Sequence, residues 1–115
     1  MIIGTIRLLP PSNRRAEVLE LLRSVRGPLR VQPGCVACDI YEEDESQPAV
    51  VFVERWASKE ALDAHLRSDM YRRILAAVEL SGGPPDVRFE HVSVIEGVEI
   101  IEQARAGARS APTGG

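Results

Sequence analysis

The stretch AVVFVERW, residues 49–56, constrains the fold more than any other part of the chain. Its pattern is that of a β-strand, in which successive side chains point to opposite faces. Val51 and Val53 therefore lie on one face of the predicted strand. Phe52 and Trp56 lie on the other, so large apolar groups occupy both faces. Because an apolar sheet face in water usually acquires a partner, the sequence predicts a sheet that is covered on both sides.

The other elements follow from hydrophobic periodicity and from breaker residues. Ser12 is expected to cap the first helix, and the pair Gly27-Pro28 is expected to end it. Ser58 can cap the second helix, and Ser68 or Asp69 can start the third. In chain order the predicted elements are a strand over 2–9, a helix over 13–26, strands over 35–42 and 49–56, a helix through Leu66, a helix over 70–80 and a strand over 86–97.

This order predicts an α+β protein with the ferredoxin-like βαββαβ fold, in which the second helix is broken into two pieces. Four antiparallel strands then carry helices on one face only. The other face is expected to pack against a second copy, so that two sheets form the core of a homodimeric barrel. One domain is predicted over residues 1–105, in which 98–105 form a short helix or a strand extension. Residues 106–115 are expected to be a disordered tail.

Composition excludes several classes of protein. Hydrophobic residues make up 44% and charged residues 27% of the 115 residues, which is typical of a globular domain. A net charge of −3 leaves no broad basic field for nucleic acid or for an anionic membrane. The sequence has no signal-peptide pattern and no apolar run of the roughly 20 residues that span a bilayer. It is therefore expected to be soluble and cytoplasmic.

Cys35 and Cys38 form a C-x-x-C motif inside the predicted second strand. Residues three apart on a regular strand point to opposite faces, so the two sulfur atoms are expected to diverge. His65 and His91 could in principle complete a zinc site, but zinc sites place paired cysteines on a tight turn. We therefore predict reduced packing cysteines and no metal site.

Three stretches, PGCVACDIYEED, VFVERWASKEALDAHLRSDMY and PPDVRFEHVSV, make the chain resemble the antibiotic biosynthesis monooxygenase family of dimeric α+β barrels. The resemblance covers residues 1–96. Its most specific part is E-x-W-x-S-x-E-A-L-x-x-H from Glu54 to His65, followed by Ser68 and Tyr71. It implies a sheet-lined cavity in each subunit. Several members insert oxygen into phenols or quinols without metal or flavin, while others are isomerases or have no known reaction.

The haem-degrading branch of that family differs at two positions. Its members carry a tryptophan where this chain has His65, and a haem-ligating histidine where this chain has Leu75. A leucine side chain cannot ligate iron. The comparison therefore argues against haem degradation.

Oxygenation without a cofactor requires a base that deprotonates an electron-rich substrate, a donor for the resulting oxyanion, and apolar walls that exclude water. His65 is the best candidate for the base, because histidine titrates near neutral pH. Its helical spacing places it at the edge of an apolar face with Leu62 and Leu66. Glu54 is the second candidate catalytic residue and can orient His65. The alternative is a histidine at the edge of the core that bonds to a backbone carbonyl or to Glu54.

Five further residues are predicted to line the substrate cavity. Trp56 closes the third strand and can pack between sheet and helix while it forms part of the wall. The hydroxyl groups of the two tyrosines are candidate oxyanion donors. The predicted substrate-binding residues are Trp56, Tyr71, Tyr41, Phe52 and His91.

Together these features predict a homodimeric, monooxygenase-like enzyme that takes dioxygen and a small aromatic, phenolic or quinol-type substrate, with no cofactor. Two alternatives remain open from the sequence. The first is an isomerase or detoxifying enzyme that acts on a small carbonyl compound, and the second is a non-catalytic dimeric barrel that binds a hydrophobic ligand.

Overall fold

The computed structural model describes residues 1–110, with the side chains of residues 1–108. It confirms the predicted order of strands and helices. The elements are β1 (Ile2–Leu8), α1 (Arg15–Arg30), β2 (Cys35–Glu42), β3 (Val50–Trp56), α2 (Lys59–Leu66), α3 (Tyr71–Leu80), β4 (Asp86–His91) and α4 (Glu99–Ser110).

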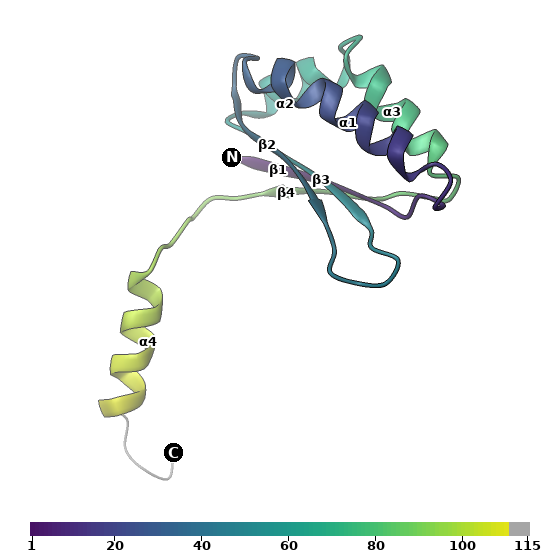
Figure 1. The fold of residues 1–115 in the computed structure, drawn as a ribbon. Helices are drawn as coiled ribbons and strands as arrows, with labels where there is room; N and C mark the ends of the chain where they lie inside the picture. The colour runs from purple at the N-terminus through teal and green to yellow at the C-terminus, as the bar shows by residue number, and fades with distance from the viewer. Residues whose placement is uncertain (111–115) are drawn as a thin grey trace.

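The four strands form one antiparallel sheet in the order β2-β3-β1-β4. Helices α1, α2 and α3 lie on one face of that sheet (Figure 1). This arrangement is the predicted ferredoxin-like α+β fold. It places the end of β3 beside the start of β1, because Trp56 pairs with Ile2.

The core lies between the sheet and the three helices. Alternate residues of β1 and β3 are buried, as the period of two in a half-covered sheet requires. The apolar stripe of α1 packs onto them, and α3 lies against α1. Buried members of this core include Ile6, Leu8, Leu22, Leu29, Phe52, Trp56 and Ile74.

The opposite face of the sheet, called the outer face below, is open in the protomer. Val51 and Val53 are half-buried there, and Tyr41 is 55% exposed. As predicted, β3 therefore carries apolar side chains on both faces: one face lies in the core, and the other points outward. Packing of this face against a second copy stays a prediction.

Two helix boundaries differ from the prediction. Helix α1 begins at Arg15, and its N-cap Arg14 makes no side-chain capping bond, so Ser12 is not the cap. Helix α1 also continues through Pro28, whose missing N–H should weaken it. The last turn is held by Leu29, which is buried, and by Arg30, which donates to the Cys38 carbonyl and to Asp39. These tertiary contacts outweigh the local breaker signal.

Helix α3 also starts differently from the prediction. Its N-cap is Met70, and neither Ser68 nor Asp69 occupies that position.

The C-terminal part also differs from the prediction. Strand β4 ends at His91, six residues before the predicted end. The helical alternative for residues 98–105 is confirmed, and α4 continues to Ser110, so residues 106–110 are helical where disorder was expected. Residues 111–115 lie outside the described residues. Within the described part of the chain, no helix is long and apolar enough to cross a membrane.

Candidate functional site

The site forms where β3 ends and α2 begins. The Ser58 side chain accepts a hydrogen bond from the Ala61 backbone N–H at 3.2 Å, which confirms the predicted cap. This cap fixes the start of α2 only two residues after Trp56. The helix then turns His65 back toward the helix-facing side of the sheet, where Glu54 and Trp56 point.

Three of the predicted residues form one hydrogen-bonded group. Trp56 Nε1 donates to Glu54 Oε2 at 2.9 Å. His65 Nε2 lies 3.1 Å from Glu54 Oε1 and also 3.1 Å from Oε2. All three side chains are buried. The Glu54 carboxyl group therefore has two hydrogen-bond partners, Trp56 and His65. These hydrogen bonds offset part of the cost of removing the carboxyl group from water.

Aromatic contacts enclose the imidazole of His65 on two sides. The Trp56 ring stacks on it with a centroid distance of 4.8 Å and an interplanar angle of 26°. The Tyr71 ring meets it edge-on, at 5.2 Å and 86°. Glu54, Trp56, His65 and Tyr71 are called the buried cluster below.

The contacts of His65 favour one tautomer. Glu54 is an acceptor for Nε2–H, so Nδ1 carries the free lone pair of the neutral ring. Nδ1 is buried and has no hydrogen-bond partner among the described residues. A buried acceptor without a partner can take a proton from a ligand that reaches it, and Glu54 would then stabilise the imidazolium.

Tyr71 can serve as a hydrogen-bond donor in this cluster. Burial, and secondly the charge of Glu54, raise the pKa of the Tyr71 phenol above its ordinary value. The hydroxyl therefore stays protonated through the physiological range. It is chemically suited to donate to an oxyanion.

The remaining predicted residues lie elsewhere. Phe52 shares the face of Glu54 but lies in the hydrophobic core. Tyr41 pairs with Val51 and lies on the outer face, so it is separated from the buried cluster by the sheet. His91 is exposed on the edge strand β4, opposite Ile2. The structure thus brings together Glu54, Trp56, His65 and Tyr71, but not Tyr41 or His91.

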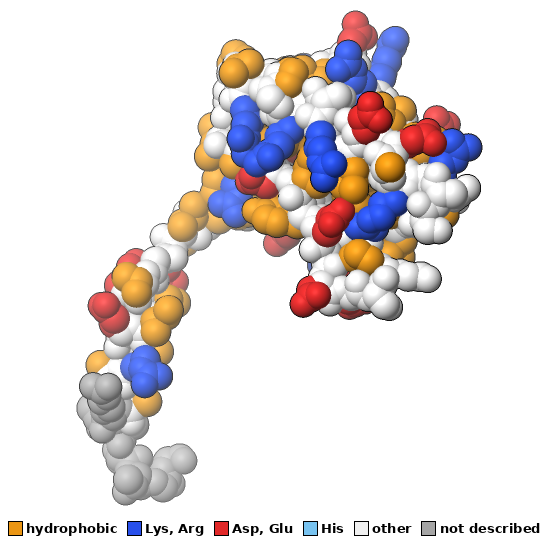
Figure 2. All heavy atoms as spheres, in the orientation of Figure 1, with side chains coloured by type: hydrophobic (Ala, Val, Ile, Leu, Met, Phe, Trp, Pro, Cys, Tyr) orange, Lys and Arg blue, Asp and Glu red, His pale blue; other side chains and the backbone are white. Residues whose placement is uncertain are grey.

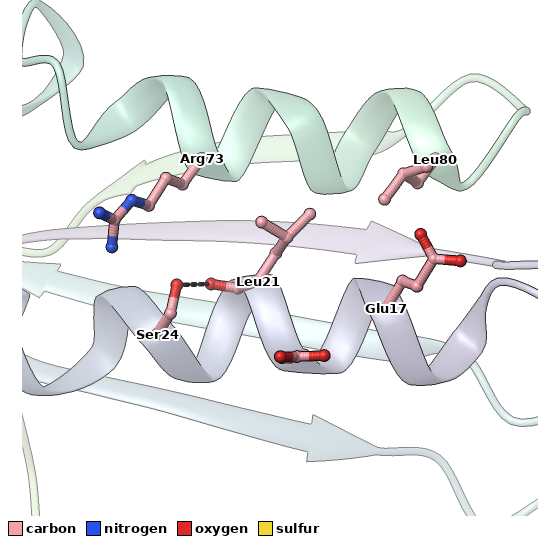
Figure 3. Close-up of a pocket in the computed structure, with 6 residues that line it drawn as sticks. Glu17, Leu21, Ser24, Arg73 and Leu80 are labelled. Atoms are coloured by element: carbon pink, nitrogen blue, oxygen red, sulfur yellow. Dashed lines mark hydrogen bonds between the residues drawn. The ribbon is translucent and has the colours of Figure 1, made fainter.

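A groove of about 550 Å³ lies beside the cluster, and His65 is the one cluster residue that lines it. His65 forms part of its wall, although the imidazole itself has an exposed fraction of 0%. A second groove, of about 440 Å³, runs between α1 and α3 and contains none of the predicted site residues (Figure 3). The first groove is lined by Gln32, Pro33, Gly34, Ser58, Glu60, Ala61, Ala64, His65 and Ser68.

The prediction that the two cysteine sulfur atoms diverge is wrong. A bulge between Cys35 and Ala37 inserts one extra residue into β2, so Cys35 lies opposite Trp56 and Cys38 lies opposite Glu54. Both cysteines therefore share the helix-facing side of the sheet with the buried cluster. Sequence reasoning missed this because no residue at the bulge departs from a strand pattern.

Both cysteines are free thiols. Burial, and secondly the charge of Glu54, raise the pKa of Cys38 to about 12, so this thiol is neutral at physiological pH. In the described part of the chain, no group of three or more His, Cys, Asp or Glu side chains is placed to hold a metal ion.

Gly34 fixes the approach of β2 to α2 beside the groove. Its φ is +83°, and an added Cβ would overlap the Cβ of Ala61. The variant Gly34→Ala is expected to lower the free energy of unfolding by about 2–3 kcal/mol, through backbone strain and overpacking. Urea denaturation followed by circular dichroism measures this loss.

Gly82→Ala is the matched control, because Gly82 has a φ of +77° and, apart from its chain neighbours, no described residue has an atom within 4 Å of the added Cβ. It isolates the backbone strain, of about 1–2 kcal/mol. Equal losses in the two variants would contradict the close contact between Gly34 and Ala61.

Comparison with known proteins shows what the chain is similar to. The family model described as "Antibiotic biosynthesis monooxygenase" matches residues 1–77. The chain is 35% identical over 72 residues to "Putative monooxygenase Rv0793" of Mycobacterium tuberculosis, covering 63% of this chain and 70% of that protein. It is 22% identical over 94 residues to "Uncharacterized protein sll1783" of Synechocystis, covering 81% of this chain but only 63% of that protein.

Solved structures show the same fold. The structure of Rv0793 from Mycobacterium tuberculosis matches with a TM-score of 0.75 and 29% identity, covering 84% of this chain and 98% of that one. A structure from Deinococcus radiodurans, described as a putative antibiotic biosynthesis monooxygenase, matches with a TM-score of 0.76 and 18% identity, covering 84% of this chain and 97% of that one. The family match spans most of the chain and includes every residue of the buried cluster. This chain therefore belongs to the antibiotic biosynthesis monooxygenase family.

Proposed function

We propose that this protein is a monooxygenase that acts on a small phenolic or quinol-type aromatic molecule without a bound cofactor, with His65 as the base. One observation carries the proposal. Glu54 is hydrogen-bonded to both Trp56 and His65, and His65 Nδ1 stays buried with no hydrogen-bond partner in the described part of the chain. Membership of the monooxygenase family supports the reaction class.

In the proposed reaction, Nδ1 of His65 removes a proton from the substrate, and Glu54 stabilises the imidazolium that forms. The substrate anion reduces dioxygen directly. For an anthrone-type substrate, a CH₂ group becomes a carbonyl group by loss of four electrons. One oxygen atom enters that carbonyl, and the other leaves as water with the two hydrogens. The Tyr71 hydroxyl donates to the substrate oxyanion, and the ring of Trp56 forms an apolar wall.

Several parts of the proposal concern the assembly. The outer face of the sheet would pack against a second copy, because its apolar residues Val51 and Val53 are only half-buried in the protomer. Tyr41 would then lie in the dimer core. Neither Tyr41 nor His91 belongs to the proposed reaction site.

The location of the protein in the cytoplasm stays a prediction.

A second candidate function is a non-catalytic barrel that binds a hydrophobic ligand. The observation that favours it is the complete burial of the His65 imidazole, which no substrate reaches unless the groove wall moves. Under this alternative, the buried cluster only stabilises the junction of β3 and α2.

Oxygen uptake separates the two functions. The purified protein is mixed with hydroquinones and anthrones, and dioxygen consumption is followed for wild type, His65→Ala and His91→Ala. The proposal expects uptake by wild type and by His91→Ala, which changes the only other histidine, and its loss in His65→Ala. Binding of these compounds without uptake would instead support the binding function. Uptake that persists in a folded His65→Ala variant would exclude His65 as the base.

A further inference from the structure

We propose that Gln32 holds the groove beside the buried cluster closed, and that its side-chain amide binds the oxygen atom of an aromatic ligand that enters. The ligand class is an aromatic ring system with a carbonyl or phenolate oxygen. The inference rests on the proposed function in one respect, because it takes His65 as the group that the ligand must reach. It adds a ligand-binding residue and a route of entry to that function.

The imidazole of His65 is covered on two sides. His65 lines the groove, but its side chain has an exposed fraction of 0%. Trp56 stacks on the ring, and Tyr71 meets it edge-on. Trp56 is fully buried at the end of β3, whereas Tyr71 is half-buried and is the first residue of α3. Because local opening begins where less surface is buried, Tyr71 is the cover that can move away from the imidazole.

Two walls form the groove. Residues 32–34 form the loop wall, and residues between 58 and 68 form the helix wall. At Gly34 the walls are tightly joined. The Ala57 N–H donates to the Gly34 carbonyl at 2.8 Å, and a Cβ on Gly34 would overlap Ala61. This end of the groove is therefore fixed.

The other end of the groove is held by one weak hydrogen bond. Gln32 Nε2 donates to Met70 Sδ at 3.8 Å, and a thioether sulfur is a weak acceptor. Met70 is the N-cap of α3 but makes no side-chain capping bond, and the first turn of α3 has no acidic residue. Loss of the contact with Gln32 therefore frees the start of α3, which carries Tyr71, to move away from the loop wall.

The connection between α2 and α3, residues 67–70, can move as a unit. Its backbone hydrogen bonds are local. The Ser68 N–H donates to the His65 carbonyl at 3.0 Å, and the Tyr71 N–H donates to the Ser68 carbonyl at 3.2 Å. A shift of the whole turn keeps such bonds. Met70 and Tyr71 pack against the core, so the closed arrangement is favoured when no ligand is bound.

A ligand oxygen is a better acceptor for Gln32 than the sulfur atom is. Among the described residues, the contact with Met70 is the only hydrogen bond of the Gln32 side chain. A carbonyl or phenolate oxygen in the groove would take the Nε2–H at an ordinary hydrogen-bond length and release Met70. Ligand binding and opening of the groove are therefore coupled through one amide group.

The charges near the groove do not select a charged ligand. Glu60 is the only ionisable residue besides His65 among the described residues that line it. Acidic and basic side chains are both spread over the visible face of the molecule (Figure 2). Recognition in the groove therefore depends on a hydrogen bond and on apolar contact with Pro33, Ala61 and Ala64.

Modification of histidine by diethyl pyrocarbonate tests the latch in the full-length chain. The rate at each histidine is measured by mass spectrometry of peptides, and the exposed His91 is the internal reference. His65 of the wild type is expected to react more slowly than His91. Gln32→Ala and Met70→Leu are each expected to raise the rate at His65, relative to His91, by about fivefold. Gln47→Ala, which changes a glutamine in the loop between β2 and β3, should leave that rate unchanged.

Calorimetric titration with tetralone and with tetralin tests the role of the Gln32 amide in binding. Tetralin has the same rings as tetralone but no carbonyl oxygen. The ratio of the two dissociation constants removes any common effect of an open groove. The preference for tetralone is expected to fall by about fivefold in Gln32→Ala and to be kept in Met70→Leu, which retains the amide.

The outcomes separate this inference from the proposed function. Wild-type reactivity of His65 in folded Gln32→Ala and Met70→Leu variants would refute the latch. An unchanged preference for tetralone in Gln32→Ala would refute the ligand-binding role of the amide. Absence of oxygen uptake in a protein that meets both expectations would refute only the proposed function. Uptake that requires His65 in a protein that fails both would refute only the inference about Gln32.

Discussion

Replacing Trp56 with alanine is expected to reduce the free energy of unfolding by about 3–5 kcal/mol. The indole is fully buried, stacks on His65 and donates to Glu54. Its removal leaves a cavity and takes one hydrogen bond from a buried carboxylate, so the two losses add. Because the free energy of unfolding of a domain is usually about 5–15 kcal/mol, this loss would be a large fraction of the stability of the protein.

Urea denaturation followed by far-UV circular dichroism measures this effect, since the variant lacks the only tryptophan and has no indole fluorescence. Trp56→Phe keeps a ring but removes the N–H, and it should cost about 1–3 kcal/mol. Val36→Ala, at an exposed position on β2, should change stability by less than about 0.5 kcal/mol. A loss below 1 kcal/mol in Trp56→Ala would mean that the buried cluster does not stabilise the core.

Replacing Glu54 with glutamine is expected to lower the turnover number for oxygen uptake by about 100-fold. The neutral amide cannot stabilise the imidazolium that forms when His65 takes the substrate proton. Its NH₂ group can also turn toward Nε2, which would place the ring proton on Nδ1 and block the proposed base. Because the carboxylate acts through His65, the Michaelis constant should change little.

Glu43→Gln is the control for this variant. The Glu43 carboxylate bonds to Arg7, whose guanidinium lowers the pKa of Glu43, and it lies outside the buried cluster. Turnover in Glu43→Gln should stay within about twofold of wild type. An equal loss in both variants would show a general effect of removing a carboxylate, and an unchanged Glu54→Gln would remove Glu54 from the mechanism.

The fold could be predicted because its signals are local and repeated. Alternation in β1 and β3, the apolar stripe of α1 and the cap at Ser58 each specify one element, and together they leave few topologies. The errors lie where tertiary contacts decide. Pro28 stays helical because Leu29 and Arg30 are held by the rest of the protein. Such contacts cannot be read from a window of neighbouring residues.

The candidate site was predictable in part for the same reason. Glu54, Trp56 and His65 all lie where β3 ends and α2 begins. The alternation of side chains along the strand and the periodicity of the helix were therefore sufficient to predict that they lie close together. Tyr41 lies on the outer face, across the sheet from the buried cluster, because its place in β2 pairs it with Val51. The bulge in β2, which turns Cys35 toward the same side as Cys38, has no signal in the sequence. One inserted residue reverses the sheet face to which every side chain on one side of the insertion points.

The stacking of Trp56 on His65 also gives the protein an optical property. All indole fluorescence of the chain arises from this one residue, which is in contact with both the proposed base and its carboxylate partner. A change of charge on the imidazole, or the arrival of an aromatic molecule beside it, alters the surroundings of the only emitter. Occupancy of the site can therefore be followed by the intrinsic emission of the unlabelled protein, even for ligands that never react.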